Sequence, residues 1–207
     1  KVQTNLLVEG FYTILDDVFA LRDMDDAADG GKVKERYNGS GATVRGFNVE
    51  GRAAFTRWFE LQAGVTLQQS RYKEPEFWSE DAEVPPVRRM FRTPDAYGYF
   101  TASFKPVRNF TADLSGTCTG SMLVQHMAGS GVAQDVAVST PSFFDMNIRL
   151  SYDVRIYKEI TMQLYGGVQN LFNAYQKDFD KGVDRDSGYI YGPSLPRSWF
   201  VGAKFTF

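Results

Sequence analysis

Alternation of apolar and polar residues is the feature that most constrains the fold of this chain. Around Leu114 the even positions are apolar, while the odd positions beside them, Asp113 and Ser115, are polar. A repeat of two residues is that of a β-strand with one apolar and one polar face. Eight segments follow this pattern: residues 2–14, 43–55, 59–72, 96–104, 110–126, 140–156, 160–172 and 198–207. No segment has a convincing helical period, so the sequence predicts an all-β fold.

The connections between these segments are of two kinds. Three are short and lie near Trp58, Arg108 and Lys158. Four are long and polar: residues 16–41, 73–92, 127–139 and 173–196. Because short and long connections alternate, we expect an antiparallel meander with all short turns at one rim and all long loops at the other. The acidic stretch at residues 23–29 is interpreted as a solvated loop.

The length and composition of the strands favour a transmembrane β-barrel over a soluble sheet. The segments exceed the usual 5–6 residues and reach the roughly 9–11 that cross a bilayer in a tilted strand. Charges lie in mid-strand on the polar faces: Glu50, Arg52, Glu60, Asp113, Asp145, Arg149, Asp153 and Arg155. Aromatic residues gather beside the short turns: Phe55, Trp58, Phe59, Phe104, Phe110, Tyr157 and Phe207. A polar lumen and an interfacial aromatic girdle explain both distributions, although a soluble sandwich also alternates and is the alternative.

Composition excludes several function classes. The net charge of −2 and the lack of a basic cluster argue against a nucleic-acid partner. The single cysteine, Cys118, excludes an internal disulfide framework. The uncharged run at residues 114–134 is too rich in Gly, Ser and Thr for a membrane-spanning helix. With one histidine and no nucleophile–base pair, we predict that the chain is not an enzyme. It starts at Lys1 without a leader, so we expect a processed chain or a piece of a longer one.

Three stretches carry a family resemblance: YNGSGATVRGFNVEG, QNLFNAYQKDFDKG and RDSGYIYGPSLPRSWFVGAKFTF. They resemble the C-terminal β-barrel part of TonB-dependent outer-membrane receptors, most closely those of Bacteroidetes. The most specific parts are RGFNVEG at residues 45–51, NLFN at residues 170–173 and the terminal Phe207. The resemblance extends over essentially the whole chain.

The resemblance implies a fold, a location and partners. Residues 1–207 would supply about the last eight strands of a 22-stranded antiparallel transmembrane barrel in the outer membrane of a Gram-negative cell. The plug domain, through which TonB acts, would belong to the remaining receptor chain. Phe207 would form part of the signal read by the barrel-assembly machinery. The implied function is energised import of a scarce ligand such as siderophore-bound iron, haem or cobalamin.

Two other functions are consistent with the pattern. The chain could be a complete eight-stranded barrel in outer-membrane lipid that serves as an anchor or adhesion protein. A piece of a soluble β-propeller or sandwich is the third. The edges separate the first two, because a fragment should leave its first and last strands unpaired within the chain.

Four tyrosines near the expected outer mouth are candidates for ligand contact, since aromatic rings can stack on a flat ligand: Tyr97, Tyr99, Tyr189 and Tyr191. Packing within an aromatic girdle is the alternative for these residues.

Four carboxylates of the last long loop suggest a calcium site: Asp178, Asp180, Asp184 and Asp186. Carboxylates at alternate positions suit calcium, but the spacing is not that of an EF-hand. A solvated loop with ion pairs to Lys181 and Arg185 is the alternative. A soft-metal site at Cys118, Met122, His126 and Met127 is not expected, because residues four apart on a strand are about 13 Å from each other. His126 is instead expected at the surface or the membrane interface.

Overall fold

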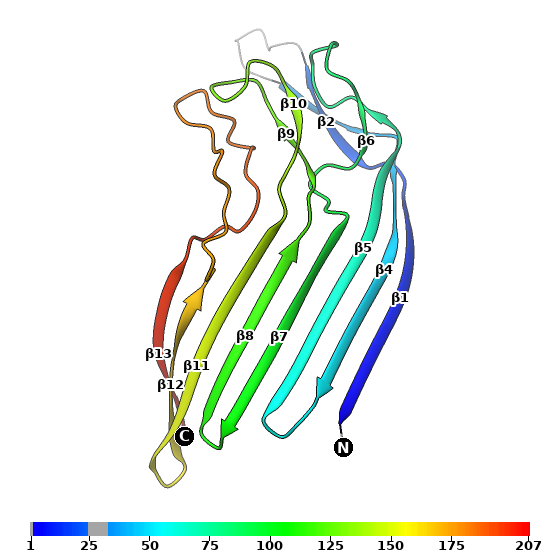
Figure 1. Cartoon of the computed structure of the whole chain (residues 1–207). Helices are drawn as coiled ribbons and strands as arrows, with labels where there is room; N and C mark the ends of the chain where they lie inside the picture. Colours follow the sequence, from blue (N-terminus) through cyan, green and yellow to red (C-terminus); the bar gives the residue numbers. More distant parts are fainter. Residues whose placement is uncertain (1, 25–32) are drawn as a thin grey trace.

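The computed structural model describes residues 2–24 and 33–207, and the regular elements of that part are all strands (Figure 1). Eight long strands form one antiparallel sheet in chain order. They are β1 (Gln3–Leu15), β4 (Ala42–Ala54), β5 (Phe59–Glu76), β7 (Ala96–Val107), β8 (Phe110–Thr119), β11 (Phe143–Tyr157), β12 (Ile160–Gln169) and β13 (Ser198–Thr206). The predicted all-β meander is confirmed. No helix in the described ranges is long and apolar enough to span a membrane.

Short strands occupy three of the long connections. They are β2 (Phe19–Met24), β3 (Val33–Asn38), β6 (Val87–Arg89), β9 (Leu123–His126) and β10 (Val136–Ser139). β2 pairs with β3, β9 with β10, and β6 extends the main sheet beside β5. The prediction that residues 16–41 are loop throughout is therefore wrong. Part of the acidic stretch at residues 23–29 lies outside the described residues.

The predicted strand at residues 110–126 is also wrong, because the structure divides it into β8 and β9. The break falls at Gly120, whose N–H donates to the carbonyl of Ala96 at 2.8 Å. A Cβ at Gly120 would lie only 2.6 Å from that carbonyl oxygen, so the close approach requires glycine. The chain then leaves the main sheet and pairs with β10.

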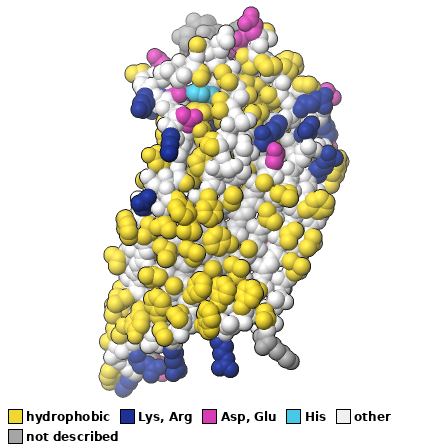
Figure 2. Space-filling view, viewed as in Figure 1, with side chains coloured by type: hydrophobic (Ala, Val, Ile, Leu, Met, Phe, Trp, Pro, Cys, Tyr) yellow, Lys and Arg dark blue, Asp and Glu magenta, His cyan; other side chains and the backbone are white. Residues whose placement is uncertain are grey.

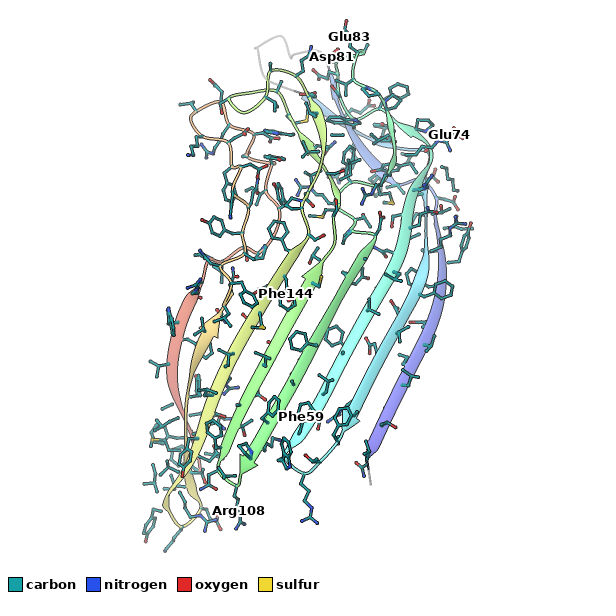
Figure 3. The ribbon with its side chains drawn as sticks, viewed as in Figure 1. Phe59, Glu74, Asp81, Glu83, Arg108 and Phe144 are labelled. Carbon is teal, nitrogen blue, oxygen red and sulfur yellow. The ribbon has the colours of Figure 1, made fainter. Side chains whose placement is uncertain are left out.

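The described parts of the long connections lie at one end of the sheet, and the short turns lie at the other (Figure 1). Figure 3 places Arg108 at the short-turn end and Asp81 and Glu83 at the loop end. At the short turns, Phe59 stacks on Phe55 and Phe104 with ring centroids 5.4 and 4.6 Å apart. The predicted alternation of turns and loops is confirmed, and part of the predicted aromatic girdle forms a packed cluster.

Strand register brings the predicted apolar faces to one side of the sheet. Leu61 pairs with Ala102, and the same row continues through Leu114, Ile148, Val168 and Trp199. Side chains on this face are exposed, for example Leu67 (56%) and Trp199 (77%). Figure 2 shows hydrophobic side chains as a broad band on this face, with Lys and Arg beyond both of its ends. A patch of this extent needs cover by lipid or protein.

The opposite face of the sheet carries a network of polar contacts between neighbouring strands. The contacts are Asn48–Glu9 (3.1 Å), Arg52–Glu60 (2.6 Å), Ser103–Asp113 (2.6 Å), Arg149–Gln163 (3.2 Å) and Gln163–Asp153 (2.9 Å). Aromatic rings on this face cover glycines of adjacent strands, as where Tyr99 lies against Gly64. This composition suits a wet lumen, as the sequence predicts.

The sheet is open within the described residues. β1 pairs only with β4, and β13 pairs only with β12. These eight strands therefore do not close on themselves, which disfavours the alternative of a complete eight-stranded barrel.

Candidate functional site

His126 at the end of β9 is buried under the last long loop. Its Nε2 lies 3.0 Å from both carboxylate oxygens of Asp180, and its ring stacks on Tyr189 at 3.7 Å with an interplanar angle of 4°. The residue is only 6% exposed, so the prediction of a surface or interfacial histidine is wrong. The reason is the break at Gly120, which turns β9 away from the main sheet and towards this loop.

Asp178 joins the two tyrosines that the sequence singled out in the same loop. Its carboxylate accepts hydrogen bonds from Tyr189 at 2.7 Å and Tyr191 at 2.5 Å. Gln176, 1% exposed, accepts from the Tyr191 N–H at 2.9 Å and donates to the Tyr189 carbonyl at 3.1 Å. We call His126, Gln176, Asp178, Asp180, Tyr189 and Tyr191 the loop core. Its polar groups fold the loop on itself and fix it to β9.

Tyr97 and Tyr99 lie apart from this cluster, on the polar face of β7. Tyr97 is 40% exposed, and Gln62 donates to the Tyr99 hydroxyl at 3.3 Å. The structure therefore separates the four candidate tyrosines into two pairs. One pair lines the sheet wall below the loops, and the other holds a loop together.

Three of the four aspartates of the predicted calcium site, Asp178, Asp180 and Asp186, have carboxylates that accept hydrogen bonds within the protein, whereas the described contact of Asp184 is through its backbone carbonyl, which accepts from the Ser130 N–H at 3.0 Å. Asp180 accepts from the N–H of Asp186 at 3.1 Å, and Asp186 accepts from Met127 and Gly188 at 2.8 and 2.7 Å. In the part of the chain that the structure describes, no group of three or more His, Cys, Asp or Glu is placed to hold a metal ion. Calcium binding stays a prediction. Of the two cations in the alternative, a solvated loop with ion pairs, Arg185 donates to the Gly182 carbonyl at 3.1 Å, so the described contact of this cation is a hydrogen bond.

Electrostatics in the loop core favours the charged carboxylates and neutral phenols. The hydrogen bond from His126 holds the pKa of Asp180 below its usual value. Burial alone would raise the pKa of Asp178, but the hydrogen bonds from Tyr191 and Tyr189 outweigh it and leave that pKa lowered. Burial, followed by the bond to Asp178, raises the pKa of Tyr191 to about 12 and also raises that of Tyr189. Both hydroxyls therefore remain donors at neutral pH.

These pKa values predict that the loop core opens in alkali. A folded pKa above the unfolded value of about 10 stabilises the loop fully below that pH, and the contribution is lost as pH rises towards about 12. Absorbance at 295 nm should therefore show a late-ionising group of tyrosines that includes Tyr189 and Tyr191. In Asp178→Asn, Tyr191 should ionise nearer to its ordinary pKa. Late ionisation that Asp178→Asn leaves unchanged would contradict the assigned hydrogen bonds.

A further aromatic hollow among the loops escaped the sequence analysis. A pocket of about 260 Å³ is lined in part by Tyr72, Phe77, Trp78, Phe91 and Glu76. Trp78 and Phe91 meet edge to face at 5.4 Å. The signal was present as Phe77 and Trp78 inside an otherwise polar segment. Another hollow, of about 530 Å³, lies between the start of β11 and the loop core and includes Phe143, Phe172 and Tyr191.

The loop regions are joined to one another. Arg92, from the connection that contains β6, donates from Nη1 to the Ile190 carbonyl at 2.9 Å and also bonds to the carbonyl of Gly188. Ser130, after β9, donates to the Lys181 carbonyl at 2.6 Å. Three long connections thus form one surface at the loop end of the sheet. Such a surface can contact a ligand.

Comparison with known proteins finds similarity in structure but not in sequence. The sequence matches no protein-family model and no curated protein. Among solved structures, the ferric-catecholate import receptor Fiu of E. coli K12 in its closed form is 19% identical with a TM-score of 0.63, and the match covers 97% of this chain and 25% of Fiu. The copper transporter OprC is 12% identical with a TM-score of 0.64, covering 99% of this chain and 29% of OprC.

The siderophore receptor PiuA of Acinetobacter baumannii is 16% identical with a TM-score of 0.61, covering 97% of this chain and 25% of PiuA. These neighbours are TonB-dependent outer-membrane receptors, and this chain spans about a quarter of the length of Fiu and PiuA. The similarity shows that the eight-stranded sheet has the fold of a section of their β-barrels.

Proposed function

We propose that this chain forms part of the β-barrel of a TonB-dependent outer-membrane receptor that imports a scarce ligand such as siderophore-bound iron, haem or cobalamin. The observation that carries the proposal is the open eight-stranded sheet, which has an exposed apolar face, a polar face and the fold of such barrels. The apolar face would contact outer-membrane lipid of a Gram-negative cell, and the polar face would line the lumen. The role is transport rather than catalysis.

The proposal assigns roles to the ends and edges of the sheet. The open edges of β1 and β13 would pair with strands of the remaining receptor chain, which would also supply the plug and the contact with TonB. Phe207, 88% exposed, would take part in recognition by the barrel-assembly machinery. We assign the receptor to the Bacteroidetes type on the motifs at residues 45–51 and 170–173 alone. The open edges speak against a complete small anchor barrel.

The native polypeptide mass distinguishes these functions. A mass several-fold above the 23.3 kDa of this chain, in detergent-extracted outer membrane, would support a large receptor. A mass of 23.3 kDa would overturn it in favour of the small barrel. Import itself is tested by deleting the gene and supplying iron only as ferric catecholate or as haem, and in a separate culture limiting cobalamin. Growth equal to that of the parent strain in all three conditions would contradict import of these ligands.

Ligand contact from the lumen wall gives a prediction for two residues. Replacing Tyr97 and Tyr99 together by alanine should weaken ligand binding about tenfold, because two stacking contacts of roughly 0.5–1 kcal/mol each are lost. Titration of whole cells with the ligand identified by the growth tests measures the effect. Tyr165→Ala, also on the polar face but on β12, is the matched control and should bind normally. Equal loss in both variants would indicate general damage to the wall.

A further inference from the structure

Arginine side chains gather on the apolar side of the sheet, next to the hydrophobic band and at the loop end. Arg45 of β4 is two residues from Phe47, and Arg71 of β5 is four residues from Leu67, so both share the face of the apolar residues. Arg89 of β6 pairs directly with Arg71. We call Arg45, Arg71 and Arg89 the rim arginines. Figure 2 shows Lys and Arg gathered beyond the band where β4, β5 and β6 meet the loops.

Two of the rim arginines, Arg45 and Arg71, have no carboxylate partner among the described residues. Arg45 donates to the neutral side-chain carbonyl of Gln69 at 2.7 Å. Within residues 2–24 and 33–207, the Arg71 guanidinium forms no hydrogen bond or ion pair. Arg89 is paired with Asp95 at 2.9 Å. The neighbouring charges further along the rim are already paired: Lys73 with Asp16, and Arg88 with Glu74.

A cavity beside these residues holds buried polar atoms without partners. It measures about 270 Å³ and is lined by Gln68, Gln69, Ser70, Arg71, Arg89 and Asp95. Ser70 is only 2% exposed, and its Oγ has no hydrogen-bond partner. The buried Nε of Arg89 likewise has none. Ser70 alternates with Arg71 along β5 and therefore faces the other side of the sheet. An unsatisfied buried donor is costly, so the arginine side of the cavity is suited to an acceptor-rich group that supplies an oxygen to the Arg89 Nε.

We propose that the rim arginines bind the phosphate of a lipid headgroup in the outer leaflet. Guanidinium groups pair with phosphate through charge-assisted hydrogen bonds, and the buried Nε of Arg89 supplies a further donor. The position selects a lipid as the source of the phosphate, because the site borders the hydrophobic band and lies at headgroup level. Asp95 does not oppose the anion strongly, since Arg89 neutralises it. The inference rests on the proposed membrane placement, with the long loops outside and the short turns at the periplasmic rim as in outer-membrane barrels, and it is independent of import and its ligand.

The test compares lipid binding by the native polypeptide and by two double variants. Native mass spectrometry in a neutral detergent would measure the affinity for phosphatidic acid relative to phosphatidylcholine. Arg45→Gln with Arg71→Gln should weaken phosphatidic acid binding about thirtyfold, since each basic residue near a lipid surface contributes roughly a fivefold gain in affinity. Arg57→Gln with Arg108→Gln makes the same charge change at the short-turn rim, and it should change the affinity by less than about twofold.

Each outcome decides the inference. Loss in the first variant alone supports it, whereas equal loss in both variants, or none in either, overturns it. Inorganic phosphate is the competing source of the anion. In lipid-free detergent, inorganic phosphate could stabilise the wild type as strongly as phosphatidic acid does and leave the first variant unaffected. The site would then bind free anions, and the lipid assignment would be wrong. A polypeptide that stays monodisperse without detergent would overturn the membrane placement as well. A detergent-dependent one with no arginine effect would overturn this inference alone.

Discussion

An arginine in place of Leu114 should lower the free energy of unfolding by about 2–4 kcal/mol, whereas an arginine in place of the adjacent Ser115 should lower it by less than about 1 kcal/mol. Leu114 lies in the middle of β8 on the apolar face, between Ala102 and Ile148. An arginine there would meet hydrocarbon. Ser115 faces the polar side, where a long charged side chain can extend into water. The two positions are neighbours in sequence, so the difference isolates the environment of each face.

Urea unfolding of the native polypeptide, refolded into vesicles, measures both effects. Heat-modifiable mobility on an unheated gel gives an independent reading of whether each variant still folds. Equal costs at the two positions would contradict the assignment of one face to lipid and the other to a wet lumen. A larger cost at Ser115 would indicate that the polar face is packed against protein.

Strand positions and their faces could be predicted from the sequence because both follow from the period of two. Register then placed Leu61, Leu114 and Trp199 in one row, as an unbroken apolar face requires. The break between β8 and β9 was missed for the same reason. The alternation continues across Gly120, and Val124 and His126 at its even positions are buried. They face the loop core, however, and not the membrane side.

The hairpin of β2 and β3 could not be predicted from composition. It pairs Phe19 with Asn38 outside the main sheet. Its sequences, FALRDM and VKERYN, do not alternate between apolar and polar residues as those of the main strands do. Polar, acidic stretches of this kind look like loop whether or not they form strands.

The loop core shows what residue types alone leave open. Asp178, Tyr189 and Tyr191 were candidates for a ligand or metal, and the structure brings them together, yet they bond to one another. His126 meets Asp180 across 54 residues of sequence. Such a pairing depends on how two loops fold over each other, which no local pattern encodes. For the NLFN motif at residues 170–173, the sequence indicated a family resemblance but not the hydrogen bonds that its first asparagine forms.

Asn170→Ala should therefore have one of the largest effects in the chain, a loss of about 2–4 kcal/mol, because it leaves buried backbone groups unsatisfied. Asn170 is 2% exposed, and its Nδ2 donates to the carbonyls of Ala174 at 2.9 Å and Leu195 at 2.8 Å. Its Oδ1 accepts from the Ala174 N–H at 2.8 Å. One side chain thus ties the start of the last long loop to its return, just before β13. Its φ of 49° adds to the cost of alanine.

Two control variants separate the causes. Asn170→Gly tolerates the positive φ and loses only the hydrogen bonds, so it should be about 1 kcal/mol less damaging than alanine. Asn173→Ala removes one hydrogen bond, which the Arg197 N–H donates to Asn173 Oδ1 at 2.9 Å. The loss of this bond should lower the free energy of unfolding by about 1 kcal/mol, and the positive φ of Asn173 adds a separate cost for alanine. Hydrogen exchange should show residues 170–197 opening first in Asn170→Ala, with β7 and β8 still protected. Uniform exchange across the sheet would mean that Asn170 stabilises the sheet as a whole. A loss of unfolding free energy below about 1 kcal/mol in Asn170→Ala would mean that the loop core, and not Asn170, holds the loop in place.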